Sequence, residues 1–204
     1  QKRIVLHVLN RIPPHSNSHG FVRGRSVLSF ARPHVGKHAV LRIDLADFFT
    51  SIAASRVFGV FLALGYPEEV SRSLSALCTH RTPSAVLQTY PASGPNAWLE
   101  RRQARRLAVP HLPQGAPTSP MLSNLVAFRL DMRLEALASA LGANYSRFAD
   151  DLAFSGDSAF ARRAPRLLKQ LQQIVEDEGF QLRPEKTRFQ RKGGRQVVCG
   201  VVVN

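Results

Sequence analysis

The sequence predicts an α+β fold whose elements follow the ferredoxin-like order β-α-β-β-α-β. Apolar runs typical of strands alternate along the chain with apolar spacing typical of helices. The strand-like runs lie at residues 39–45, 143–155 and 197–203. The helix-like segments lie at residues 53–64, 121–141 and 161–178. In this fold the first strand lies beside the two hairpin strands, so the ends of these three strands meet at the centre of the sheet.

The segment before the first strand is predicted to be a helix followed by a loop. Residues 2–12 carry apolar side chains at helical spacing, and Pro13 and Pro14 end that helix. Residues 13–26 are rich in Pro, Ser, His and Gly, which is typical of a loop.

The chain between the first strand and the hairpin is predicted to hold helices and one irregular segment. After the helix at 53–64, the spacing of Val70, Leu74 and Leu77 indicates a second helix. Residues 80–120 are rich in proline, so we expect no long regular element there.

The charge of the chain indicates a polyanionic partner. The net charge is +14 and the pI is about 11.2, which is far more than solubility requires. Nucleic acid is the natural explanation, and a basic solvated surface is the alternative. Residues 1–43 contain eight Lys or Arg residues and no acidic residue. Two further basic clusters consist of Arg101, Arg102, Arg105 and Arg106, and of Arg183, Lys186, Arg188, Arg191, Lys192 and Arg195.

Cysteine usage and hydropathy predict a cytoplasmic protein without a membrane partner. Cys78 and Cys199 offer neither a disulfide framework nor a zinc spacing, and their apolar surroundings predict buried thiols. This usage suits a reducing compartment. No apolar stretch approaches the length of a membrane span, and no signal-peptide pattern precedes Gln1.

Three carboxylates are placed to form a metal site. Asp150 and Asp151 occupy the predicted hairpin turn, and the fold brings Asp44, at the end of the first strand, beside them. Clustered carboxylates hold hard cations, and two such cations stabilise the attacking and leaving oxygens in phosphoryl transfer. An Asp pair in a turn is also common for conformational reasons alone. The pattern favours nucleotidyl transfer, with phosphodiester hydrolysis as an alternative.

Five motifs, in order along the chain, carry a resemblance to reverse transcriptases of the bacterial retron or group II intron type. They are Asp44-Leu-Ala-Asp-Phe-Phe49, Leu112-Pro-Gln-Gly-Ala-Pro-Thr-Ser-Pro120, Phe148-Ala-Asp-Asp151, Gly179-Phe-Gln-Leu-Arg-Pro-Glu-Lys186 and Gly200-Val-Val-Val-Asn204. In addition, His19-Gly-Phe-Val-Arg-Gly-Arg25 resembles the fingers-to-palm junction of retron-type enzymes. The resemblance covers nearly the whole chain and implies a polymerase palm with part of the fingers.

The resemblance implies an RNA-directed DNA polymerase that extends a DNA or RNA primer on an RNA template, using dNTPs and two Mg²⁺ ions. It implies that Asp44, Asp150 and Asp151 bind the metal ions, with the backbone carbonyl of Leu45 as a further ligand. Lys186 matches the lysine near the leaving pyrophosphate; a phosphate-binding surface lysine is the alternative.

Further residues of these motifs are expected to contact the nucleotide or the nucleic acid. Phe49 matches the aromatic residue under the sugar and is expected to exclude ribonucleotides, whereas Phe48 is expected in the core. Gln114 and Gly115 are expected at the nucleotide, with an ordinary Pro-Gly loop as the alternative. The candidates for template backbone contacts are Arg23, Arg25 and Lys37.

The resemblance also sets the expected domain organisation. We expect residues 1–38 to be a remnant of the fingers and their junction with the palm. Residues 39–204 are then the palm, with a Pro-rich insertion at about 80–111. A helical thumb follows the palm in this family, and we expect these 204 residues not to include it.

The lineage and one alternative function stay open at this point. The lineage is retron-like or another bacterial one, including defence-associated and diversity-generating enzymes, and a dedicated noncoding RNA is a candidate partner. The alternative function is an RNA-binding palm module that lacks autonomous polymerase activity.

Overall fold

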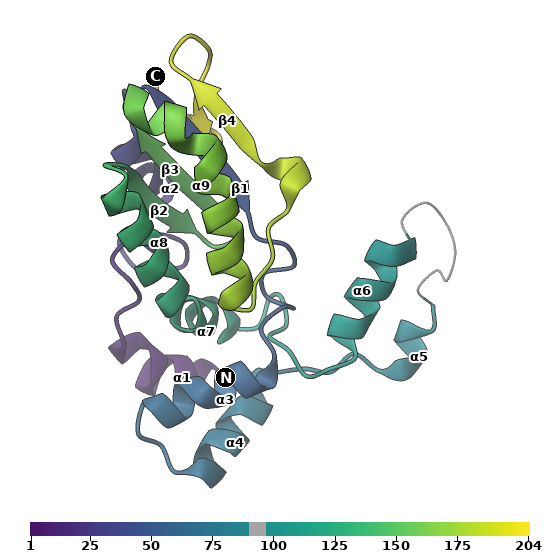
Figure 1. The fold of residues 1–204 in the computed structure, drawn as a ribbon. Helices are drawn as coiled ribbons and strands as arrows, with labels where there is room; N and C mark the ends of the chain where they lie inside the picture. The colour runs from purple at the N-terminus through teal and green to yellow at the C-terminus, as the bar shows by residue number, and fades with distance from the viewer. Residues whose placement is uncertain (90–96) are drawn as a thin grey trace. The chain divides into compact units, whose positions relative to one another are not determined.

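The computed structural model describes residues 1–89 and 97–204, apart from the side chains of residues 97–100, 102 and 165. The chain forms two compact units (Figure 1). Unit 1 consists of residues 1–12 and 47–126, and unit 2 of residues 13–46 and 127–204.

Unit 2 contains a four-stranded antiparallel sheet with the strand order β2-β3-β1-β4. The strands are β1 (Ala39–Asp44), β2 (Asn144–Phe148), β3 (Asp151–Gly156) and β4 (Arg188–Arg191). This order, with β1 between β3 and β4, is that of the ferredoxin-like fold, and the predicted fold class is therefore confirmed.

Helices cover both faces of this sheet. Helices α8 (Phe128–Ala140) and α9 (Ser158–Asp177) lie against one face (Figure 1), and α2 (Val27–Ala31) and the 3-10 helix η2 (Arg32–His34) contact the other. Side chains alternate between the two faces along each strand, so each face has its own apolar layer. The layer on the α2 side consists of Phe30, Ala31, Val40, Ala153, Val198 and Val203.

Unit 1 is helical in the residues that the structure describes. Its helices are α1 (Lys2–His7), η1 (Leu9–Arg11), α3 (Ala54–Ala63), α4 (Glu68–Cys78), α5 (Ser84–Leu87), α6 (Ala97–Leu107) and α7 (Ser119–Val126). Helices α3 and α4 pack against each other, and α3 also contacts α7. No helix among the described residues is long and apolar enough to cross a membrane.

The fourth strand of the sheet differs from the predicted one. Residues 197–203 were predicted to be a single buried strand, but they form a separate hairpin of β5 (Val197–Val198) and β6 (Val201–Val202). The hairpin turns at Cys199 and Gly200, whose φ angles are 45° and 82°. Glycine adopts this left-handed conformation without a steric cost, so the apolar run folds back on itself.

Two further predictions, one of a helix and one of an irregular segment, also need correction. The helix predicted at 121–141 is divided into α7 and α8 at Ala127, where ψ is 0°. Helix α6 has eleven residues although no long element was expected in 80–120, because the stretch Ala97–Leu107 itself contains no proline. The insertion expected at about 80–111 includes residues 90–96, which lie outside the described residues.

The helix predicted from Val70, Leu74 and Leu77 exists as α4, but these residues do not form its buried face. Val70 and Leu77 are exposed, whereas the buried positions are those of Ser71, Ser75 and Cys78. The small polar side chains allow close packing, and the hydroxyl of Ser75 donates a hydrogen bond to the carbonyl of Ala54 on α3.

Candidate active site

Two of the three predicted carboxylates lie opposite each other in the sheet. Asp44 is the last residue of β1, and its cross-strand partner is Asp151, the first residue of β3. Asp150 directly precedes Asp151, and its backbone carbonyl accepts a hydrogen bond from the amide of Leu45 at 2.9 Å. This adjacency is the one that the β-α-β-β-α-β order predicts.

The carboxylates influence one another electrostatically. Burial raises the pKa of Asp150 above its ordinary value, and the negative charges of Asp44 and Asp151 raise this pKa further. A backbone hydrogen bond and the Lys186 ammonium act in the opposite direction. The carboxylates therefore concentrate negative charge at one end of the central strands.

Basic side chains surround these carboxylates. Asp44 is almost fully buried, and its Oδ2 lies 3.1 Å from Nζ of Lys186, while its Oδ1 lies 3.3 Å from Nη1 of Arg183. Asp151 pairs with Arg42, with 3.2 Å between Oδ1 and Nη2. Each of these two carboxylates thus has a cationic partner from the same unit.

A cleft opens beside these residues. Its volume is about 340 Å³, and it is lined by Arg42, Ile43, Asp44, Asp151, Lys186 and Arg188. Pockets that bind small ligands usually have volumes of about 300–1,000 Å³. The lining combines carboxylates with Lys and Arg, which suits a ligand that contains both phosphates and metal cations.

The donor set fits a hard divalent cation, although the carboxylates are not arranged around a common point. Among the described residues, no three His, Cys, Asp or Glu side chains are placed to hold one metal ion. Oδ1 of Asp44 is buried and accepts no hydrogen bond, because its contact with Arg183 is an ion pair without hydrogen-bond geometry. Buried carboxylate oxygens of this kind are the ligands that Mg²⁺ prefers, and a metal ion here would replace existing ion pairs.

The aromatic residues after Asp44 belong to unit 1. Phe48 is buried, as predicted, and its ring centroid lies 5.5 Å from that of Phe49, which is half-buried. The backbone is not extended here, because residues 46–50 form a turn in which Asp47 has a φ of 53°. The Asp47 carboxylate accepts a 2.8 Å hydrogen bond from Nη1 of Arg106 on α6.

The predicted nucleotide residues Gln114 and Gly115 are both exposed in unit 1. Gly115 has a φ of 85°, and no atom lies within 4 Å of the position that a Cβ would occupy. Glycine at this position is therefore needed for the backbone conformation and leaves the surface open.

The three side chains predicted to contact the template differ in their exposure and in their hydrogen bonds within the protein. The side chain of Arg23 is exposed, and that of Lys37 is half-buried. Nη1 of Arg25 donates to the backbone carbonyls of Ser16 and Ser18, the latter at 2.6 Å. Arg25 therefore has a structural role in the loop before α2.

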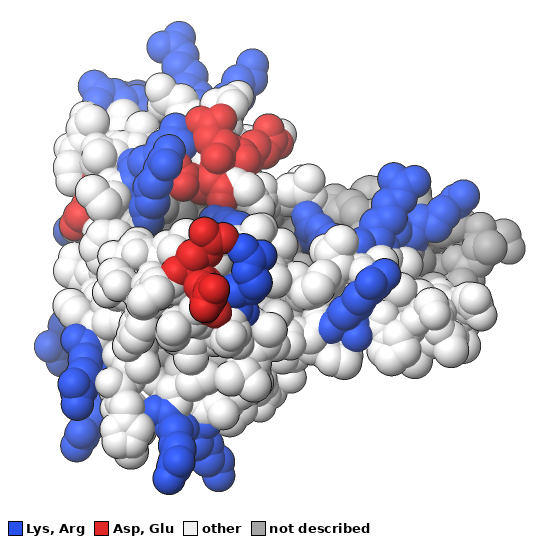
Figure 2. All heavy atoms as spheres, turned by 90° about the horizontal axis from the view of Figure 1, so that it is seen from below, with Lys and Arg blue, Asp and Glu red and all other residues white. Residues whose placement is uncertain are grey.

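The basic clusters are distributed over the surface. Figure 2 shows Lys and Arg side chains spread over the visible face, with acidic side chains gathered in a few places beside them. The part of that face that contains α6 shows basic but no acidic side chains among its described atoms. Strand β4 is mostly exposed and contributes Arg188 and Arg191.

Two histidines of unit 2 are structural. Both ring nitrogens of the fully buried His34 form 2.7 Å hydrogen bonds, one with Oγ of Ser155 and one with Oγ of Ser146. Burial lowers the pKa of His34 from 6.5 to about 4. His19 bonds to Oγ of Ser29, and burial together with the charge of Arg25 lowers its pKa to about 4.

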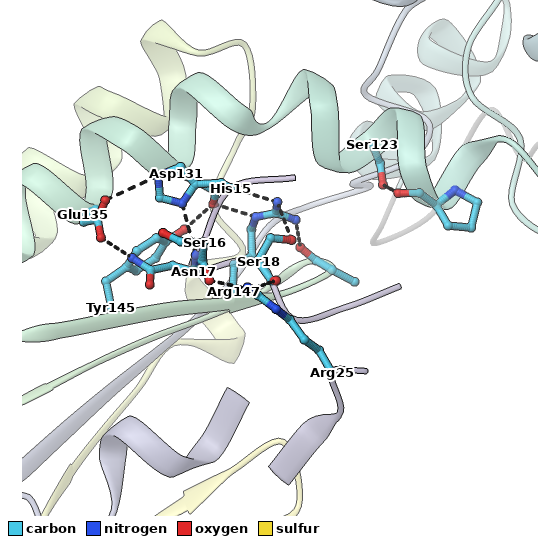
Figure 3. Close-up of polar contacts among 12 residues, drawn as sticks. His15, Ser16, Asn17, Ser18, Arg25, Ser123, Asp131, Glu135, Tyr145 and Arg147 are labelled. Atoms are coloured by element: carbon cyan, nitrogen blue, oxygen red, sulfur yellow. Dashed lines mark hydrogen bonds and ion pairs between the residues drawn. The ribbon is translucent and has the colours of Figure 1, made fainter. Parts of the chain in front are cut away.

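A buried ion pair, one member of which is hydrogen-bonded to the backbone just before Asp150, was predicted by no sequence motif (Figure 3). Arg147 on β2 and Asp131 on α8 are both fully buried and bind each other through two hydrogen bonds of 2.7 Å. The hydroxyl of Tyr145 donates a third to Asp131, also at 2.7 Å. One feature of the sequence could have indicated this pair: Asp131 lies on the buried face of α8 with Leu130, Leu134 and Ala138, and a carboxylate on a buried face needs a partner.

Cys199 also differs from its prediction. Cys78 is buried as expected, but Cys199 is only partly buried. Burial raises the pKa of the Cys199 thiol, and the charge of Asp151 and a hydrogen bond to it raise this pKa further. Cys199 is therefore a neighbour of the carboxylate site.

Comparison with known proteins identifies the family. A family model described as "Reverse transcriptase (RNA-dependent DNA polymerase)" matches residues 1–197. The chain is 44% identical to the Retron Mx65 reverse transcriptase of Myxococcus xanthus over all of this chain and 45% of that protein. It is 31% identical to the Retron Ec86 reverse transcriptase of Escherichia coli, over 98% of this chain and 53% of that protein. The chain thus spans about half the length of these relatives.

A solved structure supports the fold. The chain is similar to a chain in the structure of telomerase from Candida albicans in complex with the TWJ fragment of telomeric RNA. The TM-score is 0.54 at 13% identity, covering 100% of this chain and 36% of that chain, so this likeness concerns the fold alone. With the family match over residues 1–197, the conclusion is that the chain belongs to the reverse transcriptase (RNA-dependent DNA polymerase) family.

Proposed function

We propose that this chain carries the palm of an RNA-directed DNA polymerase, which extends a DNA or RNA primer on an RNA template with dNTPs. The observation that supports this most directly is the pairing of Asp44 with Asp151, next to Asp150, beside a cleft that Lys186 helps to line. Membership of the reverse transcriptase family and similarity to retron reverse transcriptases favour the same reaction.

In this proposal the three carboxylates would hold two Mg²⁺ ions, with the backbone carbonyl of Leu45 as a further ligand. When bound, the ions would supply Lewis-acid stabilisation of the attacking and leaving oxygens. The primer 3′-hydroxyl gives up its proton to water as its oxygen bonds to the α-phosphorus of the dNTP. The bond between that phosphorus and the oxygen that bridges to the β-phosphate breaks, and pyrophosphate leaves. The paired strands hold the backbones of Asp44 and Asp151 in fixed positions, so that little backbone reorganisation accompanies the reaction.

Lys186 is proposed to act on the leaving group. Its ammonium already lies at hydrogen-bond distance from Asp44, at the edge of the cleft, and half of the side chain is exposed. From there it can offset the charge that develops on pyrophosphate or donate a proton to it. Arg183, the second partner of Asp44, lies close enough to offset the charge of that carboxylate when Lys186 engages the phosphates.

Residues of unit 1 are proposed to bind the nucleotide. Phe49 would lie under the sugar and exclude a 2′-hydroxyl, and the open surface at Gly115 would allow the nucleotide to approach the backbone beside Gln114. Arg23, Arg25 and Lys37 are proposed contacts to the template backbone, and a dedicated noncoding RNA is a further candidate partner.

Primer extension with the full-length protein tests this function. A labelled primer on a defined RNA template, with dNTPs and Mg²⁺, should give elongated products that follow the template sequence. Retention of the RNA without extension would instead identify an RNA-binding module. Shortening of primer or template would identify a nuclease.

A further inference from the structure

We propose that Gly20 and the buried Arg147–Asp131 pair form a positioning device that fixes the backbone turn carrying Asp150 and Asp151. The proposal rests on the proposed function, because it concerns the placement of the same carboxylates. It adds residues that do not touch the substrate and act only through this turn.

The turn needs external support because its backbone is strained. Ala149, the residue before Asp150, has a φ of 54°. A residue with a Cβ adopts this left-handed conformation only at a cost in free energy, and it persists where neighbouring groups hold it in place. The carboxylates of Asp150 and Asp151 follow directly, so the conformation of Ala149 sets their direction.

The first support is the guanidinium of Arg147. Its Nη1 donates a 3.1 Å hydrogen bond to the carbonyl of Ala149, while Nε and Nη2 hold Asp131 and Nη2 also donates to Oγ of Ser18. Arg147 is fully buried, so its N–H groups cannot donate hydrogen bonds to bulk water in place of these protein acceptors. The bidentate pair with Asp131 therefore fixes the position of the guanidinium that donates to the carbonyl of Ala149 in the turn (Figure 3).

The second support is a chain segment that runs beside β2. The amide of Arg147 donates to the carbonyl of Asn17 at 2.8 Å, and the amide of His19 donates to the carbonyl of Arg147 at 2.7 Å. This pairing brings Gly20 against the turn. A Cβ at Gly20 would lie 2.6 Å from the backbone nitrogen of Ala149 and 3.2 Å from the carbonyl carbon of Phe148.

Close approach explains the glycine at position 20. Its φ lies outside the left-handed range that glycine alone favours, so the conformation does not require it. The atoms that a Cβ would meet belong to the backbone, and no side-chain rotation could relieve the contact. A methyl group at Gly20 must therefore displace the turn or the segment that contains Gly20.

The segment itself is fastened at several points, so it cannot take up the whole displacement and the turn must move as well. Nδ2 of Asn17 donates to Oε1 of Glu135 on α8 at 2.8 Å (Figure 3). Arg25 binds the carbonyls of Ser16 and Ser18, and the His19 ring bonds to Oγ of Ser29. Because a misplacement of about 1 Å can reduce a reaction rate by about a hundredfold, Gly20→Ala should affect the chemical step.

The test compares Gly20→Ala with Gly59→Ala in the full-length protein. Gly59 lies in α3, and no atom is within 4 Å of the position that a Cβ would take there, so the same substitution has open space. The readouts are the single-turnover extension rate at saturating dNTP, the KM for dNTP, RNA affinity, melting temperature, and Mn²⁺ affinity measured by electron paramagnetic resonance.

We expect Gly20→Ala to lower the extension rate about 10- to 100-fold and to weaken Mn²⁺ binding several-fold. RNA affinity and the KM for dNTP should stay within about twofold of the wild type. Gly59→Ala should match the wild type in extension rate, KM, RNA affinity and Mn²⁺ affinity, with an equal or higher melting temperature because Ala is a better helix former than Gly. A folded Gly20→Ala protein with the wild-type extension rate and Mn²⁺ affinity would overturn the proposal. If the wild type extends no primer, the proposed function fails, and the Mn²⁺ titration still tests the positioning device separately.

A second variant covers the case in which Gly20→Ala does not fold. Ser18→Ala removes the hydrogen bond between Ser18 and Nη2 of Arg147 but leaves the pair with Asp131 in place. We expect the extension rate to fall about 2- to 10-fold with unchanged RNA affinity, because the Arg147 guanidinium loses a hydrogen-bond acceptor. An unchanged rate and unchanged Mn²⁺ affinity in folded Ser18→Ala would contradict the proposal.

Discussion

Asp44 and Asp151 are cross-strand partners at one end of the two central strands of the sheet. Directly opposed residues have Cβ atoms about 4.5–5.5 Å apart, and like charges at this separation destabilise a sheet unless other groups compensate. Here Lys186 and Arg183 compensate Asp44, and Arg42 compensates Asp151. The fold thus places these carboxylates together at the end of the central strands, where a bound cation can replace the Lys and Arg side chains as their partner.

The salt dependence of RNA affinity should show how many basic side chains contact phosphates. With several phosphate contacts at about −0.7 each on single strands, the slope of log affinity against log salt should be about −2 to −4. Replacing Arg188, Arg191 and Lys192 together by Ala should reduce the slope by about 2 units if all three contact phosphates. Filter-binding titrations between low and moderate salt measure both slopes. A flat titration of the wild type would show that the +14 charge serves another purpose.

Phe49→Val should weaken discrimination against ribonucleotides. A packed ring that must yield to a 2′-hydroxyl costs roughly 1–3 kcal/mol, or about ten- to a hundredfold in selectivity. The measurement is the ratio of kcat/KM for dNTP and rNTP on one RNA template. An unchanged ratio in folded Phe49→Val would exclude the gate, and an equal loss in Phe48→Val would show that the gate had been assigned to the wrong ring.

His34 should make the protein less stable at acidic pH. Burial is the main cause that lowers its pKa from 6.5 to about 4, so between these values the unfolded chain binds a proton that the folded chain does not. The contribution of neutral His34 to the free energy of unfolding is therefore fully present above about pH 6.5, and it is lost as the pH decreases towards 4. From pH 7.5 to pH 5 the loss from His34 should be about 2 kcal/mol.

Urea unfolding at the two pH values measures this effect. His34→Gln should reduce the pH-dependent loss of stability by most of the roughly 2 kcal/mol expected from His34. The pH dependence due to His19, whose pKa is also lowered to about 4, should remain in this variant. His7→Gln, at an exposed residue of α1, should leave the pH dependence as it is in the wild type. Equal pH dependence in the wild type and in His34→Gln would show that another group is responsible.

Asp131→Asn should destabilise the fold strongly. It leaves the guanidinium of Arg147 buried without a carboxylate, and breaking a buried pair in this way costs about 3–5 kcal/mol. Asp177→Asn is the matched control, because it removes the same charge from a partly exposed pair with Arg133. Denaturant unfolding at pH 7 should give a clearly lower midpoint for Asp131→Asn than for Asp177→Asn. Similar midpoints would mean that the buried pair contributes no more than the surface pair.

The elements that could be predicted from the sequence are those whose apolar pattern is regular. The central strands and the adjacency of Asp44 to Asp150 and Asp151 follow from alternating apolar runs and the β-α-β-β-α-β order. Strand β4 was not predicted because it is a mostly exposed edge strand, with Arg188 and Arg191 where an apolar run was sought.

The supporting parts of the site could not be predicted in the same way. A strand pattern shows that Arg147 shares a face with Tyr145, but it does not show that both contact a carboxylate on α8. The requirement for Gly20 comes from a contact with Ala149, 129 residues along the chain, which no local pattern encodes. Contacts of this kind depend on how distant elements pack, which periodicity along one element does not reveal.

The most direct test of catalysis by the carboxylates is the extension rate of Asp150→Asn in the full-length protein, with Asp177→Asn as the control for charge. We expect Asp150→Asn to abolish primer extension while its RNA affinity stays within a few-fold of the wild type, and we expect Asp177→Asn to extend primers normally. A folded Asp150→Asn protein that extends primers at nearly the wild-type rate would contradict catalysis by these carboxylates.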